Sequence, residues 1–415
     1  MERAGLARLL GGARAEGARQ ILIAEADPQR FMAAFACAVG GAGEVFLCDP
    51  AWRVHEHSQL DELLASKPQV AGFRSQAAQP SEAGWLCIAT GGTGGRLKFA
   101  RHDTATIAAA VRGFTRHFGL PRVNAAGVLP LHHVSGLMAW MRCVLTGGEY
   151  LPLDWKAVEE GARPELPGKT AGWTISLVPT QLERLMRQPA AVDWLRRFRI
   201  IFLGGAAAWP ALLDRAAELR LPLSPGYGMT ETAAMIAALR PEEFLAGMRG
   251  CGALLPHVRV GFDAEGTILV DGDSLFRGYY PGWREPGEFA TQDGGWLDER
   301  GHLHVSGRRD AVIVTGGEKV NPAEVEAVLR GSGELAEVVV LGVPDAEWGE
   351  RVVAVYPAAA KPDLARVAAA AARLLSPAKR PKQWVALPGE WPANVQGKID
   401  RSEVARRAGA SGAGG

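Results

Sequence analysis

The chain has 415 residues, which is enough for a large hydrophobic core and for two or more domains. Hydrophobic residues make up 47% and charged residues 22%, as in an ordinary globular protein and unlike a disordered one. The formal net charge is +1, so there is no electrostatic reason to expect nucleic acid or an anionic membrane as the main partner. These values leave a homo-oligomeric state open.

The cysteines and the N-terminal residues indicate a cytoplasmic protein. The five cysteines are scattered without a CxxC pattern, which is typical of reduced thiols. Charged residues at Glu2, Arg3 and Arg8 interrupt the first segment, so a secretory signal is not expected. No window approaches the ~18 apolar residues that span a bilayer.

The first part of the chain alternates apolar strands with amphipathic helical segments. This pattern predicts βα units and a mostly parallel sheet. Asp103 precedes an apolar-periodic run and can cap a helix that reaches about Phe118. The other strands are expected at residues 20–24, 44–48, 125–131, 149–153, 174–178 and 199–203. The other helices are expected at residues 28–40, from Ser135, at 181–187 and at 210–219.

The pattern changes twice in the second half of the chain. From Gly250, short β-prone runs separated by glycine turns predict a small antiparallel β subdomain, with strands at 258–262, 267–270 and 302–305. From Asp310, a compact α+β unit is expected, with strands at 311–315, 337–343 and 352–356 and a helix at 364–375.

Another helix of this α+β unit carries clear end signals. Asn321 is its expected N-cap, Pro322 takes the first helical position, Glu324 would complete a capping box and Gly331 follows its end. The fold class predicted is therefore α/β, with a large domain at 1–309 that includes a β subdomain at about 250–309. A small α+β domain at 310–407 and a disordered Ala/Gly/Ser tail at 408–415 complete the chain.

A glycine-rich stretch from Thr90 to Lys98 reads TGGTGGRLK and follows an apolar strand. Glycines let several backbone N–H groups approach one anion, and the threonine hydroxyls and the lysine add donors for phosphate oxygens. It is not a Walker loop, because the lysine lacks the following Ser or Thr. By itself, such a stretch is more often an ordinary loop than a phosphate site.

Four further segments have a functional and a plain structural interpretation. Gly226–Glu231 could stack a base and offer a carboxylate to a phosphate-bound metal, or it could be a turn into a helix at 232–238. Asp293 with Arg308 could hold a ribose, although Asp-Gly is also a common turn. The glycine loop Thr315–Lys319 could approach a ligand or simply connect a strand to a helix. Lys398 lies in a glycine-adjacent loop, where most lysines are only solvated.

The order of these segments resembles the adenylate-forming superfamily of acyl-CoA synthetases, firefly luciferases and nonribosomal peptide synthetase adenylation domains. Matching segments run from about Trp85 to Arg401. The resemblance implies ATP, Mg²⁺ and coenzyme A as cofactors, and a mobile C-terminal domain that turns about Asp310. It implies Lys398 as the catalytic lysine of the first half-reaction, with Lys98 at the phosphates and Glu231 as the metal ligand.

The resemblance also implies a set of cofactor-binding residues. Those of the phosphate loop are Thr90, Gly91, Gly92, Thr93 and Gly94. Those near adenine, ribose, phosphates and the thiol path are Gly204, Gly205, Ala206, Tyr227, Gly228, Met229, Thr230, Asp293, Arg308, Gly316 and Gly317. The phosphate loop departs from the family pattern, because Gly91, Gly94 and Leu97 replace a serine, a threonine and a proline. The portion before this loop is also shorter than usual in the family.

The expected acid-binding segments resemble those of the o-succinylbenzoate–CoA ligases of menaquinone and phylloquinone synthesis. The segment LPLHHVSGL, residues 129–137, is followed by Arg142. The resemblance implies that His133 lies at the acyl pocket, with Ser135 also contacting substrate, and that Arg142 meets the carboxylate that is not activated. A dicarboxylate needs a cation for its spare charge, and arginine can bind it bidentately. The plain alternatives are a helix-surface arginine and a core histidine, with His132 a neighbour without a role.

The function expected is an ATP-dependent acid–CoA ligase that acts through an acyl-adenylate on o-succinylbenzoate, a small carboxylic acid. Another aryl- or acyl-CoA ligase is the nearest alternative, and a non-catalytic nucleotide-binding homologue is the alternative from another class. A hydride-transfer enzyme is not expected, because no GxGxxG opens a βα unit.

Overall fold

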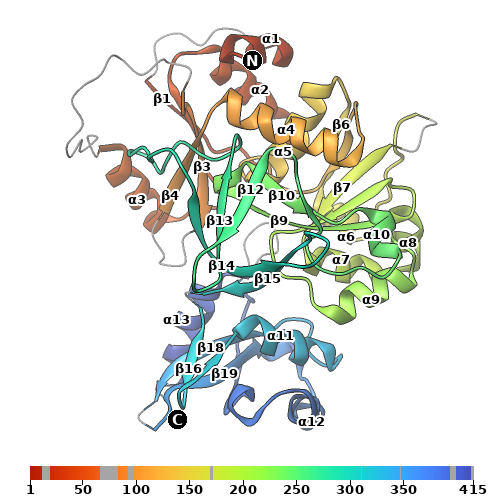
Figure 1. Cartoon of the computed structure of the whole chain (residues 1–415), viewed down its shortest axis with the longest axis vertical. Helices are drawn as coiled ribbons and strands as arrows, with labels where there is room; N and C mark the ends of the chain where they lie inside the picture. The colour runs from red at the N-terminus through yellow and green to blue at the C-terminus, as the bar shows by residue number, and fades with distance from the viewer. Residues whose placement is uncertain are drawn as a thin grey trace.

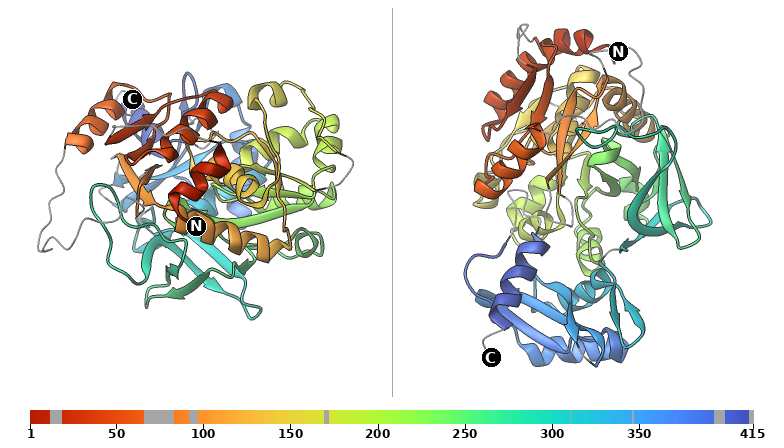
Figure 2. Two further views of the ribbon diagram at one scale, coloured as in Figure 1. Left: turned by 90° about the horizontal axis from the view of Figure 1, so that it is seen from above. Right: turned by 90° about the vertical axis from the view of Figure 1, so that its left-hand side faces the viewer.

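The computed structural model describes residues 1–11, 19–65, 83–91, 97–168, 172–309, 311–345, 347–392 and 399–412. A large N-terminal part and a smaller C-terminal part lie end to end along the longest axis of the molecule (Figure 1). The right-hand view of Figure 2 shows the antiparallel β subdomain on one side of the large part, above the small part. The sequence predicted this division.

A four-stranded sheet begins the large part, in the order β1 (Gln20–Ile23), β2 (Glu44–Leu47), β3 (Leu86–Gly91) and β4 (Leu97–His102). The first three strands are parallel, and β4 turns back antiparallel to β3. Three helices accompany it: α1 (Arg3–Leu10), α2 (Pro28–Gly40) and α3 (Val54–Ala65). Helix α2 begins where expected, because the Asp27 side chain accepts a hydrogen bond from the Arg30 backbone N–H at 2.8 Å.

A seven-stranded sheet forms the rest of this α/β core. Its order is β11 (Ala253–Leu254), β10 (Ala234–Ala238), β9 (Leu223–Met229), β8 (Ile200–Leu203), β7 (Trp173–Leu177), β5 (Asn124–Gly127) and β6 (Tyr150–Pro152). The neighbouring strands from β6 to β9 are parallel, and β10 and β11 are antiparallel additions. The helices of this region are α4 (Thr104–Phe118), α5 (Val134–Thr146), α6 (Trp155–Glu159), α7 (Pro179–Met186), α8 (Pro189–Leu195), α9 (Pro210–Glu218) and α10 (Pro241–Leu245).

Helix α4 joins the cores of the two sheets. Asp103 caps it as predicted, with its carboxylate accepting from the backbone N–H groups of Ala105 and Thr106. Ile107 packs with the first sheet, whereas Phe114, two turns later, packs with the second. Residues seven positions apart lie on the same face of a helix, so this face of α4 packs against the first sheet near its start and against the second sheet near its end.

The β subdomain is a meander of β12 (Val258–Phe262), β13 (Thr267–Gly272), β14 (Phe289–Leu297) and β15 (Leu303–Arg308), all antiparallel. The small part has a sheet of β16 (Ile313–Thr315), β17 (Glu318–Val320), β18 (Val339–Asp345), β19 (Gly349–Pro357) and β20 (Gln383–Leu387). Its helices are α11 (Pro322–Gly331), α12 (Leu364–Leu374) and α13 (Arg401–Gly412). It meets the large part where the Arg330 guanidinium lies 5.4 Å from the Trp209 ring and Arg184 pairs with Glu337 at 3.3 Å.

Four local expectations differ from the structure. Residues 234–238, considered as part of a helix, form strand β10, because left-handed backbone at Ala233 and Ala234 turns the chain back against β9. The strand expected to reach residue 131 ends at Gly127, and its last apolar residues are buried in the turn before α5.

The other two differences lie in the small part. Glu324 makes no capping box; its carboxylate binds the Lys379 ammonium at 2.6 Å, and α11 includes Gly331. The tail expected to be disordered from residue 408 continues α13 to Gly412, because Val404 and Ala408 lie one turn apart and both pack on the sheet.

Candidate active site

The carboxylate of Glu231 is the centre of the first group of side chains. Glu231 lies in a single 3₁₀ turn (Thr230–Thr232) directly after β9 and is buried, with 7% of its surface exposed. Its Oε1 accepts hydrogen bonds from the hydroxyls of Tyr279 at 2.7 Å and Thr90 at 3.3 Å. Within the described ranges no Lys, Arg or His forms an ion pair with it. A buried carboxylate with only neutral donors suits a cation ligand.

Lys98 lies near the two residues whose hydroxyls donate to this carboxylate. It stands opposite Thr90 in the β3–β4 pair, and its Nζ lies 5.2 Å from the centre of the Tyr279 ring. The structure therefore brings together three residues predicted from two distant segments. Gly91 ends β3, whereas Gly92, Thr93 and Gly94 lie outside the described residues. Burial, followed by the nearby charge of Glu231, raises the pKa of Tyr279 far above its usual range, so its hydroxyl stays a donor.

Tyr227 and Asp293 form the second group. The Tyr227 hydroxyl donates to Asp293 Oδ2 at 2.6 Å, and Arg308 Nε lies 3.9 Å from Asp293 Oδ1. Burial, followed by the Asp293 charge, raises the pKa of Tyr227 well above its usual range. Asp293 and Arg308 are direct partners in the β14–β15 pair, so the predicted ribose site draws on two neighbouring strands.

The glycines near the second group permit close approach of backbone. A Cβ on Gly228 would lie 2.0 Å from the Ala234 carbonyl oxygen, so the tight β9–β10 turn requires glycine there. Gly204, Gly205 and Ala206 follow β8, and a Cβ on Gly204 would lie 3.9 Å from the Gly226 carbonyl oxygen. Met229 and Thr230 continue from Gly228 to Glu231. The predicted adenine segments are thus neighbours at the ends of β8 and β9.

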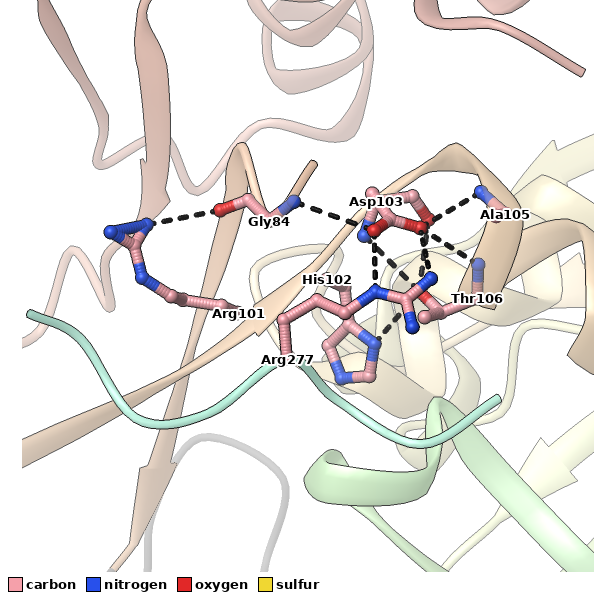
Figure 3. Close-up of polar contacts among 7 residues, drawn as sticks. All are labelled: Gly84, Arg101, His102, Asp103, Ala105, Thr106 and Arg277. Carbon is pink, nitrogen blue, oxygen red and sulfur yellow. Dashed lines mark hydrogen bonds and ion pairs between the residues drawn. The ribbon is translucent and has the colours of Figure 1, made fainter. Parts of the chain in front are cut away.

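A polar cluster under this site was not predicted as functional (Figure 3). Arg277 Nε donates to Asp103 Oδ2 at 2.7 Å, so the residue that caps α4 also holds the segment that carries Tyr279. His102, fully buried, contacts the Thr230 carbonyl oxygen through Nε2 at 2.7 Å and the Thr106 hydroxyl through Nδ1 at 3.1 Å. These contacts fix the backbone directly before Glu231. Since Arg277 and Asp103, like His102 and Thr230, lie more than a hundred residues apart, no sequence spacing indicated these two contacts.

Arg142 lies in the interior rather than on a helix surface. Only 6% of it is exposed, and its guanidinium carbon lies 4.0 Å from the centre of the Phe114 ring and 5.8 Å from that of Phe202. Its Nε is buried without a hydrogen-bond partner, and no carboxylate in the described part of the chain pairs with it. Burial lowers the pKa of Arg142 to about 10, so the group is still a cation at neutral pH. A buried, unneutralised arginine is costly unless an anion completes the site.

His133 and Ser135 lie at the start of α5. His133 is the half-buried N-cap residue and Ser135 is in the first turn. The His132 and His133 rings are in contact, with centroids 4.4 Å apart. Sequence reasoning gave His132 no role, yet it is buried beside Asp49.

The remaining predicted residues belong to the small part. Gly316 and Gly317 form the β16–β17 turn, both with positive φ, and the Gly316 N–H donates to the Trp348 carbonyl at 2.8 Å. No hydrogen bond among the described residues joins this turn to Thr90, Tyr227, Glu231 or Asp293. Lys398 and Asp310 lie outside the described residues. No helix in the described ranges is long and apolar enough to cross a membrane.

The large α/β part with a β meander, the small α+β part and the buried carboxylate that binds Thr90 and Tyr279 are consistent with the class of adenylate-forming proteins. The family models agree: "AMP-binding enzyme" matches residues 18–280, and "AMP-binding enzyme C-terminal domain" matches residues 324–398. The first match covers more than half of the chain. The chain therefore belongs to the AMP-binding enzyme family.

Two relatives of this chain share one name. The chain is 33% identical over 285 residues to the 2-succinylbenzoate–CoA ligase of Listeria monocytogenes, which covers 67% of this chain and 60% of that protein. It is 29% identical over 364 residues to the Enterococcus faecalis protein of the same name, and the match covers 83% of this chain and 74% of that protein. The chain thus spans about three fifths of the length of the first of these relatives.

Solved structures share the fold. The o-succinylbenzoate CoA synthetase of Bacillus subtilis, in complex with its acyl-adenylate intermediate, matches with a TM-score of 0.75 at 24% identity, covering 97% of this chain and 91% of that one. ATP-bound MatB of Rhodopseudomonas palustris matches with a TM-score of 0.72 at 22% identity, covering 98% and 92%.

Proposed function

We propose that this protein is an ATP-dependent acid–CoA ligase that works through an acyl-adenylate, and that its acid is o-succinylbenzoate. The observation that carries the choice of acid is Arg142, a buried guanidinium with no carboxylate partner among the described residues. A dicarboxylic aromatic acid provides the missing anion, and the Phe114 and Phe202 rings provide apolar contact area. The names of the relatives support the same choice.

The nucleotide would bind across the two groups of side chains. Asp293 can accept hydrogen bonds from ribose hydroxyls, and Arg308 beside it adds a cation. Lys98 and the Thr90 hydroxyl suit phosphate oxygens. Glu231 fits a magnesium ion, because its carboxylate is buried and receives only neutral hydroxyl donors. Bound magnesium supplies positive charge to the phosphates.

In the first step, a carboxylate oxygen of the acid attacks the α-phosphorus of ATP, and the bond to pyrophosphate breaks. The protein does little covalent chemistry here; its residues hold the attack line and offset negative charge. Lys98 serves this from the large part, and Lys398 serves it from the small one. Arg142 holds the spare carboxylate and so presents the other carboxylate to the phosphorus.

In the second step, the thiol sulfur of coenzyme A attacks the acyl carbon, AMP leaves and a thioester forms. Lys398 has no task in this step. We propose that the small domain turns about Asp310 and brings Gly316 and Gly317 to the thiol path. Such a turn also excludes water from an adenylate that water would hydrolyse. A cytoplasmic location completes the proposal, and it is supported by five cysteines that form no disulfide.

A panel of acids tests this proposal. The protein is given ATP, Mg²⁺ and coenzyme A with o-succinylbenzoate, simple aryl acids or fatty acids, and pyrophosphate release and thioester formation are followed. We expect o-succinylbenzoate to give the highest kcat/KM. A better aryl or fatty acid would identify another CoA ligase, and no pyrophosphate with any acid would indicate a non-catalytic homologue.

A further inference from the structure

Three side chains of the kinds that bind metals, those of Asp49, His132 and His133, lie close together in the large part. Asp49 follows β2, and the two histidines precede α5, so the cluster joins segments about 80 residues apart. One ligand atom from each residue lies within 4.8 Å of those of the other two. Two imidazole nitrogens and one carboxylate oxygen are a common donor set for zinc and related transition metals.

The spacing between two of these atoms favours a shared ion over a hydrogen bond. His132 Nε2 lies 3.6 Å from Asp49 Oδ1, which is too long for an N–H···O hydrogen bond. Two ligands about 2.0–2.1 Å from one tetrahedral zinc lie roughly 3.4 Å from each other. The observed separation is close to that value.

The burial of His132 provides an independent observation. Only 4% of the residue is exposed, and its Nε2 is buried without a hydrogen-bond partner within the described part of the chain. An unsatisfied buried polar atom is uncommon in folded proteins, and here it points toward Asp49. A ligand between the two residues would satisfy both. His133 has two ring nitrogens, so one can bind a metal while the other makes a hydrogen bond.

We propose that Asp49, His132 and His133 bind one transition-metal ion of the zinc type, with a fourth position open to water or to an added ligand. This site is separate from the Mg²⁺ role of Glu231, since Mg²⁺ prefers oxygen ligands and an octahedral arrangement. If the proposed ligase function holds, the ion is inhibitory, because it occupies His133 at the expected acyl pocket. That consequence rests on the proposed function, whereas metal binding does not.

The direct test is a titration of the tag-free, chelator-treated full chain with Co²⁺. We expect the visible absorption of a tetrahedral Co²⁺ site at one ion per chain, lost when Zn²⁺ is added in competition. His132→Phe keeps the ring contact with His133 and removes the nitrogen; it should weaken binding at least tenfold. Asp49→Asn keeps the size of the side chain and should weaken binding as well. His55→Phe, at an exposed histidine of α3, is the matched control and should bind as the parent does.

The thermal midpoint provides the second readout. Zn²⁺ should raise the Tm of the parent and of His55→Phe but not that of Asp49→Asn, because an ion that binds only the folded state stabilises it. Absent Co²⁺ absorption, or unchanged affinity in both His132→Phe and Asp49→Asn, would refute the site. Should His132→Phe not fold, Asp49→Asn decides alone. Because neither readout needs catalysis, metal binding without any acid activation would sustain this inference while refuting the ligase.

Discussion

The Tyr227 hydroxyl donates a 2.6 Å hydrogen bond to the Asp293 carboxylate, and this contact joins strand β9 of the seven-stranded sheet to strand β14 of the β subdomain. The raised pKa of Tyr227, caused by burial and then by the Asp293 charge, keeps the proton on the hydroxyl. The bond therefore holds the carboxylate expected to bind ribose at a fixed place beside the ends of β8 and β9.

Tyr227→Phe should raise the KM for ATP about tenfold, because a hydrogen bond to a charged group contributes about 1.5 kcal/mol or more. The KM for the acid should change little, since Tyr227 contacts the expected nucleotide site and not Arg142. Initial rates of pyrophosphate release at varied ATP measure this. Tyr356→Phe, at a buried tyrosine of the small domain, serves as control. An unchanged KM for ATP would remove Tyr227 and Asp293 from the nucleotide site.

Arg142→Gln, which keeps most of the side-chain volume, should lower kcat/KM for o-succinylbenzoate about a hundredfold, because a charge-assisted bidentate contact is lost. The monocarboxylic analogue that lacks only the spare carboxyl group tests whether the loss is specific. The analogue without the spare carboxyl should be affected less than about threefold, because it has no charge for Arg142 to meet. Arg122→Gln is the exposed control. An equal loss for both acids would mean that Arg142 only supports the fold.

Lys398→Ala should abolish adenylate formation and leave thioester formation from a supplied acyl-adenylate within about threefold of the parent rate. The reason is that the ammonium group offsets phosphate charge only in the first step. ATP–pyrophosphate exchange and thioester formation are measured separately. Lys361→Ala, elsewhere in the small domain, is the control. Equal loss in both steps would contradict the proposed turn of the small domain.

The stability of the protein should fall as the pH drops below about 6.5. Burial lowers the pKa of both His102 and His257 from 6.5 to about 4 in the folded state. Between about pH 4 and pH 6.5 the unfolded chain binds more protons than the folded one. The free energy of unfolding therefore rises with pH in this range, and the increase is complete above about pH 6.5. The lowered pKa of Asp103 acts in a separate, more acidic range.

Thermal unfolding at several pH values measures this effect. His257→Gln should reduce the dependence of Tm on pH, because it removes one of the histidines whose pKa burial lowers. His55→Gln, at an exposed histidine, should leave that dependence unchanged. A parent Tm that does not change between about pH 7 and about pH 5 would contradict the burial of neutral imidazole at these positions.

Local signals in the sequence were sufficient to predict most of the helices and strands. The Asp103 cap, the helix at 28–40 and the strand at 258–262 have the predicted bounds, because capping groups and apolar periodicity act within a few residues. The segment at 232–238 was ambiguous for the same reason. Its alanine-rich run suits a helix, and only the pairing of β10 with β9 makes it a strand.

The candidate site also has residues that the sequence predicted and contacts that only the structure showed. The sequence alone predicted Thr90, Lys98, Tyr227, Glu231 and Asp293 as a set, through the order of motifs and the family resemblance that this order carries. Only the tertiary structure showed that Tyr279 donates to Glu231 and that Arg277 binds Asp103. It also placed Arg142 in the interior, beside two aromatic rings, and His132 against Asp49. Hydrogen bonds and burial depend on the distance between side chains in space, and residues such as Asp103 and Arg277, 174 positions apart, carry no local signal of it.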